Sequence, residues 1–353
     1  MRRPHVLALL LLLFAVLTAM GGPIDRATME RIHAEVRTPH KVGVVIQPPA
    51  GKKVDCPNVF RHNGRWWMVY IQLESDPVGY TTQLAVSDNL VDWKPLGTIL
   101  PQGPAGSWDA CNAAGGLALF DTEWGGGNGI GQHEGRYWIS YLSGKVPGYE
   151  TPPLSISLAH TDDPTRAKSW EKLPAPVLNP HDTDARPWET YVLYKSHIIR
   201  DPARTLGAPF VMFYNAKAEG GSEKIGLALS HDLRTWKRHL ADPVIENSAP
   251  DAKRSTISGD PQVVRIGDLW VMFYFGAFWK PGAFDTFAAS RDLVHWTKWD
   301  GPDLIAPSAE WDAQYAHKPW LLKHEGVVYH FYCAVDKRDN RTIALATSKP
   351  VRP

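Results

Sequence analysis

One run of aromatic and β-branched residues recurs five times along the chain. Each run carries a Tyr at the same place and is bounded by Gly or other turn-forming residues, which is typical of a strand in a hairpin. The five runs are RWWMVYI (65–71), RYWISYL (136–142), PFVMFYN (209–215), LWVMFYF (269–275) and VVYHFYC (327–333), with the tyrosines Tyr70, Tyr141, Tyr214, Tyr274 and Tyr332. The pattern predicts five copies of one strand.

Further strand-like segments flank each copy. A short apolar stretch precedes the tyrosine strand, and an alternating segment follows it and leads through a polar turn to a Trp, as in GLALSHDLRTW (226–236). With an outer strand after the Trp, each copy becomes a four-stranded antiparallel sheet that cannot bury both faces alone. Five such sheets predict an all-β fold, a five-bladed β-propeller with four strands per blade. The alternative is a β-sandwich whose strands resemble one another by chance.

The chain is predicted to divide into three parts. Arg2 and Arg3 precede an apolar run from Val6 to Met20 and then small residues, so residues 1–21 are predicted to be a signal peptide. The run is shorter than the ~20 residues that a membrane span needs, although an uncleaved anchor is the alternative. Residues 22–50 are predicted to be an N-terminal arm that helps to close the ring, and residues 51–353 the propeller domain. The mature protein is therefore expected to be exported, periplasmic or extracellular, with no membrane span.

Composition narrows the classes of function. The 38 Lys and Arg residues nearly balance 37 Asp and Glu, so the chain lacks the basic excess of a nucleic-acid binder. Fifteen Trp residues are unusual, and flat aromatic rings suit both strands and stacking against sugars. The three cysteines, Cys56, Cys111 and Cys333, allow either one disulfide with a free thiol or three buried thiols. They lack zinc-site spacing, so no metal site is predicted from them.

Acidic residues stand just before the first strand of each predicted blade. In a propeller these inner strands line a central channel, and their starting ends face one shared funnel. The residues in this position are Asp55, Asp109, Glu189, Asp260, and Asp312 or His317. Carboxyl groups that converge on one point are what cleavage of a glycosidic bond requires, one as acid and one as base or nucleophile.

At this point the chain resembles a known family. The five repeats, the S-x-D-L-x-x-W ending of SHDLRTW (230–236) and SRDLVHW (290–296), and an acid near each inner strand are similar to the five-bladed propeller glycoside hydrolases. These are the arabinofuranosidase/xylosidase-like family 43 enzymes and their fructosidase-like and mannoside-phosphorylase relatives. The resemblance implies three catalytic residues by position: Asp55 as base, Asp109 as a residue that tunes the acid, and Glu189 as the general acid.

The first blade departs from the family pattern. The family's first-blade Asp commonly stands directly before Pro, whereas here Cys56 separates Asp55 from Pro57, and the Asp-Pro pair is Asp260-Pro261 in the fourth blade. Because consecutive strand residues face opposite sides, Asp55 reaches the funnel only if Cys56 points into the blade or a bulge intervenes. Asp260 is therefore the alternative base. The parallel sequence in the fifth blade predicts that His317 faces the funnel.

Other residues near these strands are predicted to contact the substrate. They are Trp108, Arg186, Trp188, Asp260, His317 and Lys318. No cofactor is expected to be required, although a calcium ion in the channel near His317 is possible on the residue types present.

These observations predict an exported glycoside hydrolase that acts by inversion on chain ends of an oligosaccharide from a plant or algal polysaccharide. The alternatives are a glycoside phosphorylase, with Arg186, Lys195 and Lys318 holding phosphate, a retaining fructosidase-like enzyme, and a non-catalytic sugar-binding propeller. The sugar, the linkage and the oligomeric state stay open.

Overall fold

The computed structural model describes residues 21–167, 169–250 and 254–351. The predicted signal peptide, apart from its last residue, lies outside this range. Strands dominate the described chain, with one α-helix, α2 (Arg26–Val36), and one 3-10 turn, η1 (Glu310–Asp312). The prediction of an all-β fold is confirmed. In the described part of the chain no helix is both long enough and apolar enough to cross a membrane.

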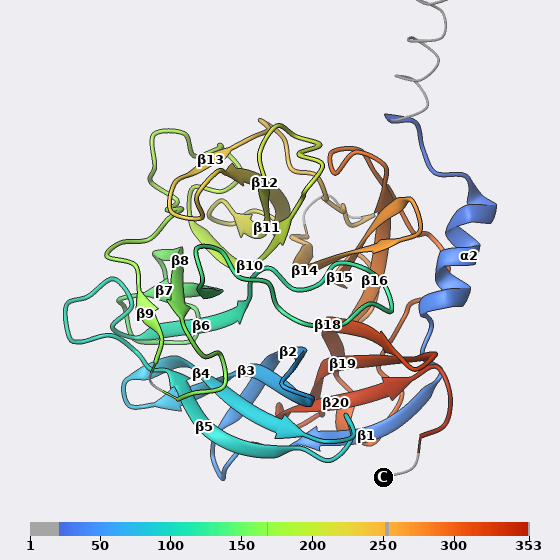
Figure 1. The fold of residues 1–353 in the computed structure, drawn as a ribbon, viewed down its shortest axis with the longest axis horizontal. Helices are drawn as coiled ribbons and strands as arrows, with labels where there is room; N and C mark the ends of the chain where they lie inside the picture. The colour runs from blue at the N-terminus through green and yellow to red at the C-terminus, as the bar shows by residue number, and fades with distance from the viewer. Residues whose placement is uncertain (1–20, 168, 251–253, 352–353) are drawn as a thin grey trace, which may run out of the picture.

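The strands form five antiparallel four-stranded units, which Figure 1 shows around a common centre. Each unit runs from an inner strand at the centre to an outer strand. The first unit contains β2 (Lys53–His62), β3 (Arg65–Ser75), β4 (Val78–Ser87) and β5 (Lys94–Leu100). The second contains β6 (Asn112–Leu117), β7 (Tyr137–Gly144), β8 (Leu154–Thr161) and β9 (Glu171–Lys172). The third contains β10 (Val192–Arg200), β11 (Phe210–Lys217), β12 (Lys224–Ser230) and β13 (Trp236–Arg238).

The remaining two units complete the set. The fourth contains β14 (Ile257–Ile266), β15 (Leu269–Ala277), β16 (Ala283–Ser290) and β17 (Trp296–Lys298). The fifth contains β18 (Tyr315–His324), β19 (Val327–Val335), β20 (Arg341–Thr347) and, as its outer strand, β1 (His40–Ile46). Units two and three are joined into one sheet by a single parallel pair between Val192 and Leu154. Because β1 pairs antiparallel with β20, the N-terminal arm joins the two ends of the chain.

The arm also contains a helix that the sequence pattern did not predict. Asp25 caps α2, its Oδ1 accepting a hydrogen bond of 2.9 Å from the Thr28 amide. Met29, Ile32 and Val36 form its buried face and pack into a core cluster with residues of β14 and β15. Eleven residues offer few turns for a periodic pattern, so tertiary packing stabilises this helix more than its own propensity.

The S-x-D-L-x-x-W sequence of two units, and its variant SDNLVDW (87–93) in the first, form the same turn. A Ser hydroxyl accepts a hydrogen bond from the amide of a Leu with positive φ, and the Trp indole donates to the carbonyl of that Leu. The Trp–Leu pairs are Trp93 with Leu90 (3.0 Å), Trp236 with Leu233 (2.9 Å) and Trp296 with Leu293 (2.9 Å). The polar turn that the sequence predicts before these Trp residues is confirmed. The five tyrosines of the repeat are all buried on the second strand of their units.

A β-bulge interrupts the inner strand of four units at the same place. The register shifts lie between Asp55 and Asn58, Leu193 and Ser196, Gly259 and Gln262, and His317 and Trp320. In three of these strands the bulge contains a residue with positive φ directly before a proline: Cys56 (50°), Asp260 (49°) and Lys318 (64°). Proline has no amide hydrogen to donate to the neighbouring strand, so the hydrogen bonds between the two strands are interrupted at the bulge. The side chain of the residue before the proline changes direction there.

Candidate functional site

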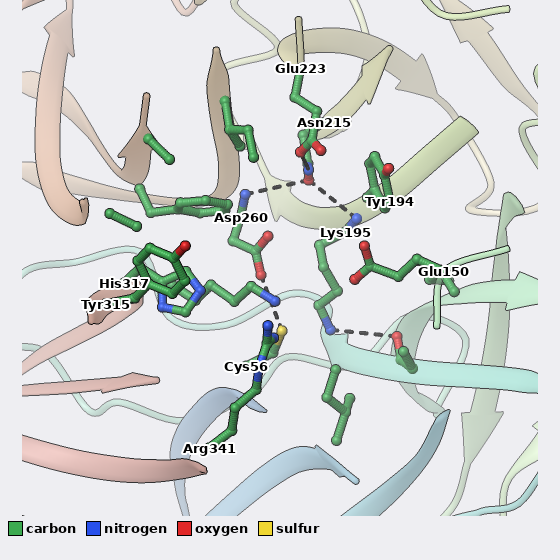
Figure 2. Close-up of a pocket in the computed structure, with 18 of the residues that line it drawn as sticks. Cys56, Glu150, Tyr194, Lys195, Asn215, Glu223, Asp260, Tyr315, His317 and Arg341 are labelled. Atoms are coloured by element: carbon green, nitrogen blue, oxygen red, sulfur yellow. Dashed lines mark hydrogen bonds between the residues drawn. The ribbon is translucent and has the colours of Figure 1, made fainter. Parts of the chain in front are cut away.

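The bulges open into a pocket at the centre of the molecule, with a volume of about 240 Å³ (Figure 2). All five inner strands contribute to its wall, through Cys56, Ala114, Lys195, Asp260 and Lys318. The rest of the wall comes from other strands, including Arg341 of β20, and from connections between strands, including Glu150 and Glu223. The five inner strands therefore converge on one pocket, four of them at the positions of their bulges.

Three carboxyl groups line the pocket: Glu150, Glu223 and Asp260. Glu223 lies just before β12 and is only 7% exposed. It accepts a hydrogen bond of 3.2 Å from the Asn215 amide and lies 3.5 Å from the Lys217 ammonium. Burial raises the pKa of Glu223 to about 7. A carboxyl group with such a pKa carries a proton in a large fraction of molecules at neutral pH.

Glu150 and Asp260 have related environments. Glu150 lies in the connection between β7 and β8 with a φ of 52°, and Asp260 stands in the bulge of β14. The Asp260 carboxylate accepts a hydrogen bond of 3.2 Å from the Cys56 thiol. Burial raises the pKa of both carboxyl groups, against the attraction of Lys318. The pocket therefore collects three carboxyl groups whose protonated form is favoured relative to an exposed acid.

Three cationic side chains also line the pocket, and we call the part of the wall that they form the pocket floor: Lys195, Lys318 and Arg341. The Lys195 ammonium donates to the carbonyl oxygens of Gly115, at 2.7 Å, and Ala114, at 3.4 Å. The small residues of β6 permit this approach, because a Cβ atom on Gly116 would lie 3.2 Å from the same ammonium. Among the described residues no carboxylate lies within 4 Å of it, so its charge remains available to a ligand.

Asp55 lies at the edge of this floor and binds the other two cations. It is 2% exposed, and its Oδ2 accepts from Lys318 at 2.6 Å and from Arg341 at 3.2 Å. Burial opposes ionisation, but the charges of Lys318 and Arg341 outweigh it and hold the pKa of Asp55 well below its usual range. Asp55 does not line the pocket, whereas Cys56 does. The bulge thus turns Cys56, rather than Asp55, toward the centre.

Asp109 and Glu189 lie outside the pocket and share one arrangement with Asp312. Each carboxylate accepts a hydrogen bond from the repeat tyrosine of its own unit, and each pairs with a cation on the outer strand. Asp109 binds Tyr141 (3.4 Å) and Lys172 (2.5 Å), Glu189 binds Tyr214 (2.6 Å) and Arg238, and Asp312 binds Tyr332 (2.8 Å) and Lys41. We call these three residues the anchoring acids, because they connect the start of an inner strand to the outer strand.

The sequence interpretation placed the funnel too early along the inner strands. Glu189 and Asp312 each stand three residues before their strand begins, whereas Lys195 and Lys318 stand within it, at the bulge. The acids therefore meet the tyrosine at the side of the unit, and the bulge residues meet at the centre.

The other predicted contact residues divide in the same way. Asp260, His317 and Lys318 line the pocket. Arg186 instead donates to the Leu240 carbonyl at 2.7 Å, and Trp188 stacks on Tyr214 and donates to the Ala241 carbonyl at 3.1 Å. Trp108 is half-buried beside the anchoring acid Asp109 and does not line the pocket.

His317 is buried in the pocket wall, with its Nδ1 3.2 Å from the Cys333 carbonyl oxygen. Burial lowers the pKa of His317 to about 3, so the ring is neutral at neutral pH. Within the described ranges no cluster of three or more His, Cys, Asp or Glu side chains has the geometry to hold a metal ion. The three cysteines are buried free thiols, which decides the question that the sequence left open.

The sequence analysis missed Glu150 and Glu223. Neither belongs to the repeat: Glu150 lies in the connection between β7 and β8, and Glu223 lies between β11 and β12. One topological signal could have found them. Since neighbouring strands are antiparallel, the second strand ends, and the third begins, on the side where the inner strand starts. Acids in these connections therefore face the funnel.

Comparison with known proteins identifies similar structures. No protein-family model matches the chain, and neither does any curated protein. Two solved structures, one named as a complex of BT0996 with RGII and the other named "Glycoside hydrolase", are each 45% identical to it, with a TM-score of 0.88 over 93% of this chain and 96% of theirs. A thermostable family-43 glycoside hydrolase is 17% identical, with a TM-score of 0.61 over 87% of this chain and 97% of its own. An exo-1,5-alpha-L-arabinanase from a bovine ruminal metagenomic library is 14% identical, with a TM-score of 0.55 over 84% and 92%.

Proposed function

The chain belongs to the glycoside hydrolases, and from this premise we propose that it removes a terminal sugar from an oligosaccharide by inversion, with Glu150 and Glu223 as the catalytic carboxyl groups. The observation that carries the proposal is the central pocket with these two acids in its wall. Its volume of about 240 Å³ is below the roughly 300–1,000 Å³ typical of pockets for drug-sized ligands. Such a space suits one sugar ring and therefore the end of a saccharide.

The raised pKa of Glu223 supports the acid role for this residue and leaves the base role to Glu150. Glu223, with its pKa raised to about 7, holds a proton near neutral pH and donates it to the glycosidic oxygen as the bond to the anomeric carbon breaks. Glu150 acts as the base that takes a proton from the attacking water. After the reaction Glu223 is ionised and Glu150 protonated, and proton exchange with water restores both. Lys195, Lys318 and Asp260 supply hydrogen bonds to the hydroxyl groups of the bound sugar.

The substrate class follows from a relative. One of the structures that are 45% identical to this chain is named as a complex with RGII. We therefore take an RGII oligosaccharide as the substrate, in agreement with the expectation of a plant polysaccharide fragment. Export by the predicted signal peptide would place the enzyme where such oligosaccharides occur. We also take the five four-stranded units as the blades of a five-bladed β-propeller, supported by their strand order and by the closing pair of β1 and β20.

The test is the loss of turnover in Glu150→Gln and Glu223→Gln, measured on an RGII oligosaccharide with product analysis by chromatography. Each variant should lose roughly 10²–10⁴-fold in kcat, the usual contribution of a positioned acid or base. Glu325→Gln is the matched control, because its side chain is 85% exposed. Full activity in either pocket variant, with the control unchanged, contradicts the assignment.

Two further measurements separate the roles and the stereochemistry. Azide should restore activity to Glu150→Ala and not to Asp55→Ala, because a small anion can occupy the space of the missing base. Proton NMR of the first product should show the inverted anomer. Retention would mean that Glu150 attacks the sugar directly, at a carboxyl separation of about 5–5.5 Å instead of roughly 6.5–9.5 Å.

The unpaired charge of Lys195 favours one second candidate, a glycoside phosphorylase, in which phosphate replaces the attacking water. Assays with and without inorganic phosphate distinguish the two, because a phosphorylase releases a sugar phosphate only when phosphate is present.

A further inference from the structure

Tyr149 stands out among the aromatic residues because it is exposed. The large apolar side chains of the described residues are mostly buried, and the exposed ones are Val78, Leu96 and Tyr149. Tyr149 is 46% exposed and at the same time lines the central pocket, so it lies at the rim. It precedes Glu150 in the connection between β7 and β8.

Contacts from other units hold Tyr149 in one position. Arg341 of the fifth unit donates from Nη1 to the Tyr149 hydroxyl at 2.9 Å, and its guanidinium lies over the ring at 5.2 Å from the centroid. Tyr80 of the first unit packs edge-on at 5.9 Å. The Gly148 amide beside Tyr149 donates to the Val78 carbonyl at 2.9 Å.

These contacts are not needed to build a core. Ordering a side chain costs conformational entropy, and burial does not repay that cost here because about half of Tyr149 remains in water. Arg341 is itself ordered by Asp55, at 3.2 Å. A rigid, exposed aromatic ring at the rim of a pocket is the arrangement that a stacked ligand requires.

We propose that Tyr149 and Arg341 form the binding site for the second sugar ring of the substrate, the one on the leaving-group side of the scissile bond. The inference rests on the proposed function, since the pocket holds the terminal ring and the next ring must lie at its rim. The negative face of the phenol ring attracts the C–H groups of a sugar ring. Arg341 fixes the platform and directs its remaining N–H groups toward hydroxyls on that ring.

The experiment compares two substrates that differ only in the second ring. One is an RGII oligosaccharide, and the other is the glycosyl fluoride of the sugar that the enzyme releases, identified first by product analysis. Tyr149→Ala should raise KM for the oligosaccharide about ten-fold or more, as expected for a lost aromatic contact. On the fluoride its kcat/KM should stay within about three-fold, because this substrate has no second ring.

Three additional variants sharpen the result. Tyr149→Phe keeps the aromatic ring and should retain most of the affinity for the oligosaccharide. Arg341→Lys keeps the positive charge near Asp55 but loses the planar guanidinium that lies over the Tyr149 ring, so it should behave like Tyr149→Ala. Leu96→Ala, an exposed residue of β5, is the matched control and should change nothing. An equal loss on both substrates would show that Tyr149 merely supports the pocket, and no loss on the oligosaccharide would show that the second ring binds elsewhere. Either result overturns this proposal, whereas full activity of Glu150→Gln or Glu223→Gln would instead overturn the proposed function.

Discussion

Two sets of acids near the inner strands of this protein differ in their charge partners. The anchoring acids Asp109, Glu189 and Asp312 each bind a tyrosine hydroxyl and a cation of the outer strand. The pocket acids Glu150, Glu223 and Asp260 have no such tyrosine partner among the described residues, and the one ion pair found for them there is the 3.5 Å contact of Glu223 with Lys217. Burial consequently raises the pKa of every pocket acid.

The two sets therefore differ in how the charge of each carboxylate is compensated. A buried carboxylate that is hydrogen-bonded and paired with a cation connects the segments that supply those partners. Where such partners are fewer, burial raises the pKa of the carboxyl group, to about 7 at Glu223, which is the range that acid–base catalysis uses. Burial of an acid near an inner strand therefore does not by itself place that acid in the pocket.

The sharpest way to break this comparison is to remove an anchoring acid. Glu189→Gln removes one of three carboxylates that bind the buried Arg238, and Asp182 (3.0 Å) and Asp184 (2.7 Å) remain. The loss should lower the free energy of unfolding by about 3 kcal/mol in urea titrations. The folded fraction should keep its kcat, because Glu189 lies outside the pocket. A stable Glu189→Gln enzyme with greatly reduced kcat would mean that Glu189 acts in catalysis.

Asp55 combines features of both sets of acids. It is paired with cations, as the anchoring acids are, but its partners Lys318 and Arg341 line the pocket. Asp55→Asn should lower both stability and kcat/KM, because Lys318 and Arg341 lose the charge that orders them. The folded-state pKa of Asp55 lies below its usual value, so this part of the stability is present above about pH 4 and is lost on further acidification. Urea unfolding of parent and variant at pH 7 and pH 3 should therefore differ less at the lower pH.

Glu223 should show the opposite pH dependence. The folded state binds its proton more tightly than the unfolded chain does, so stability is lost as the pH rises from about 4.5 to about 7. The parent should lose about 2–3 kcal/mol in this range relative to Glu223→Gln, which has no proton to release. Thermal unfolding of both proteins at pH 5 and pH 8 measures the difference, and parallel curves would show that Glu223 titrates normally.

The smallest effect is expected from metal removal. We expect EDTA to leave kcat and KM unchanged, since Lys195, Lys318 and Arg341 supply the positive charge on the pocket floor. Loss of activity with EDTA and its recovery with calcium would contradict this expectation and support an ion near His317.

Some of the site followed from the sequence, and some of it did not. The acid-plus-proline pattern of the inner strands led to Asp260, and its parallel in the fifth unit led to His317 and Lys318, all of which line the pocket. The same reasoning chose Asp109 and Glu189, because an acid before a strand looks alike in sequence whether it faces the centre or the side of a unit. Their tyrosine and cation partners lie 25 to 63 residues away in the chain.

The sequence alone determined the all-β fold, the five repeats, the turn beneath each Trp and the glycoside hydrolase resemblance, because these depend on local periodicity and short hydrogen-bonded turns. The tertiary structure decided which acids line the pocket. Bulges of one residue turn Cys56 toward the centre and leave Asp55 at its edge, and connections outside the repeat bring Glu150 and Glu223 to the pocket. The reactivity of a carboxyl group depends on its burial and on the charges around it, and in this fold those charges come from other units.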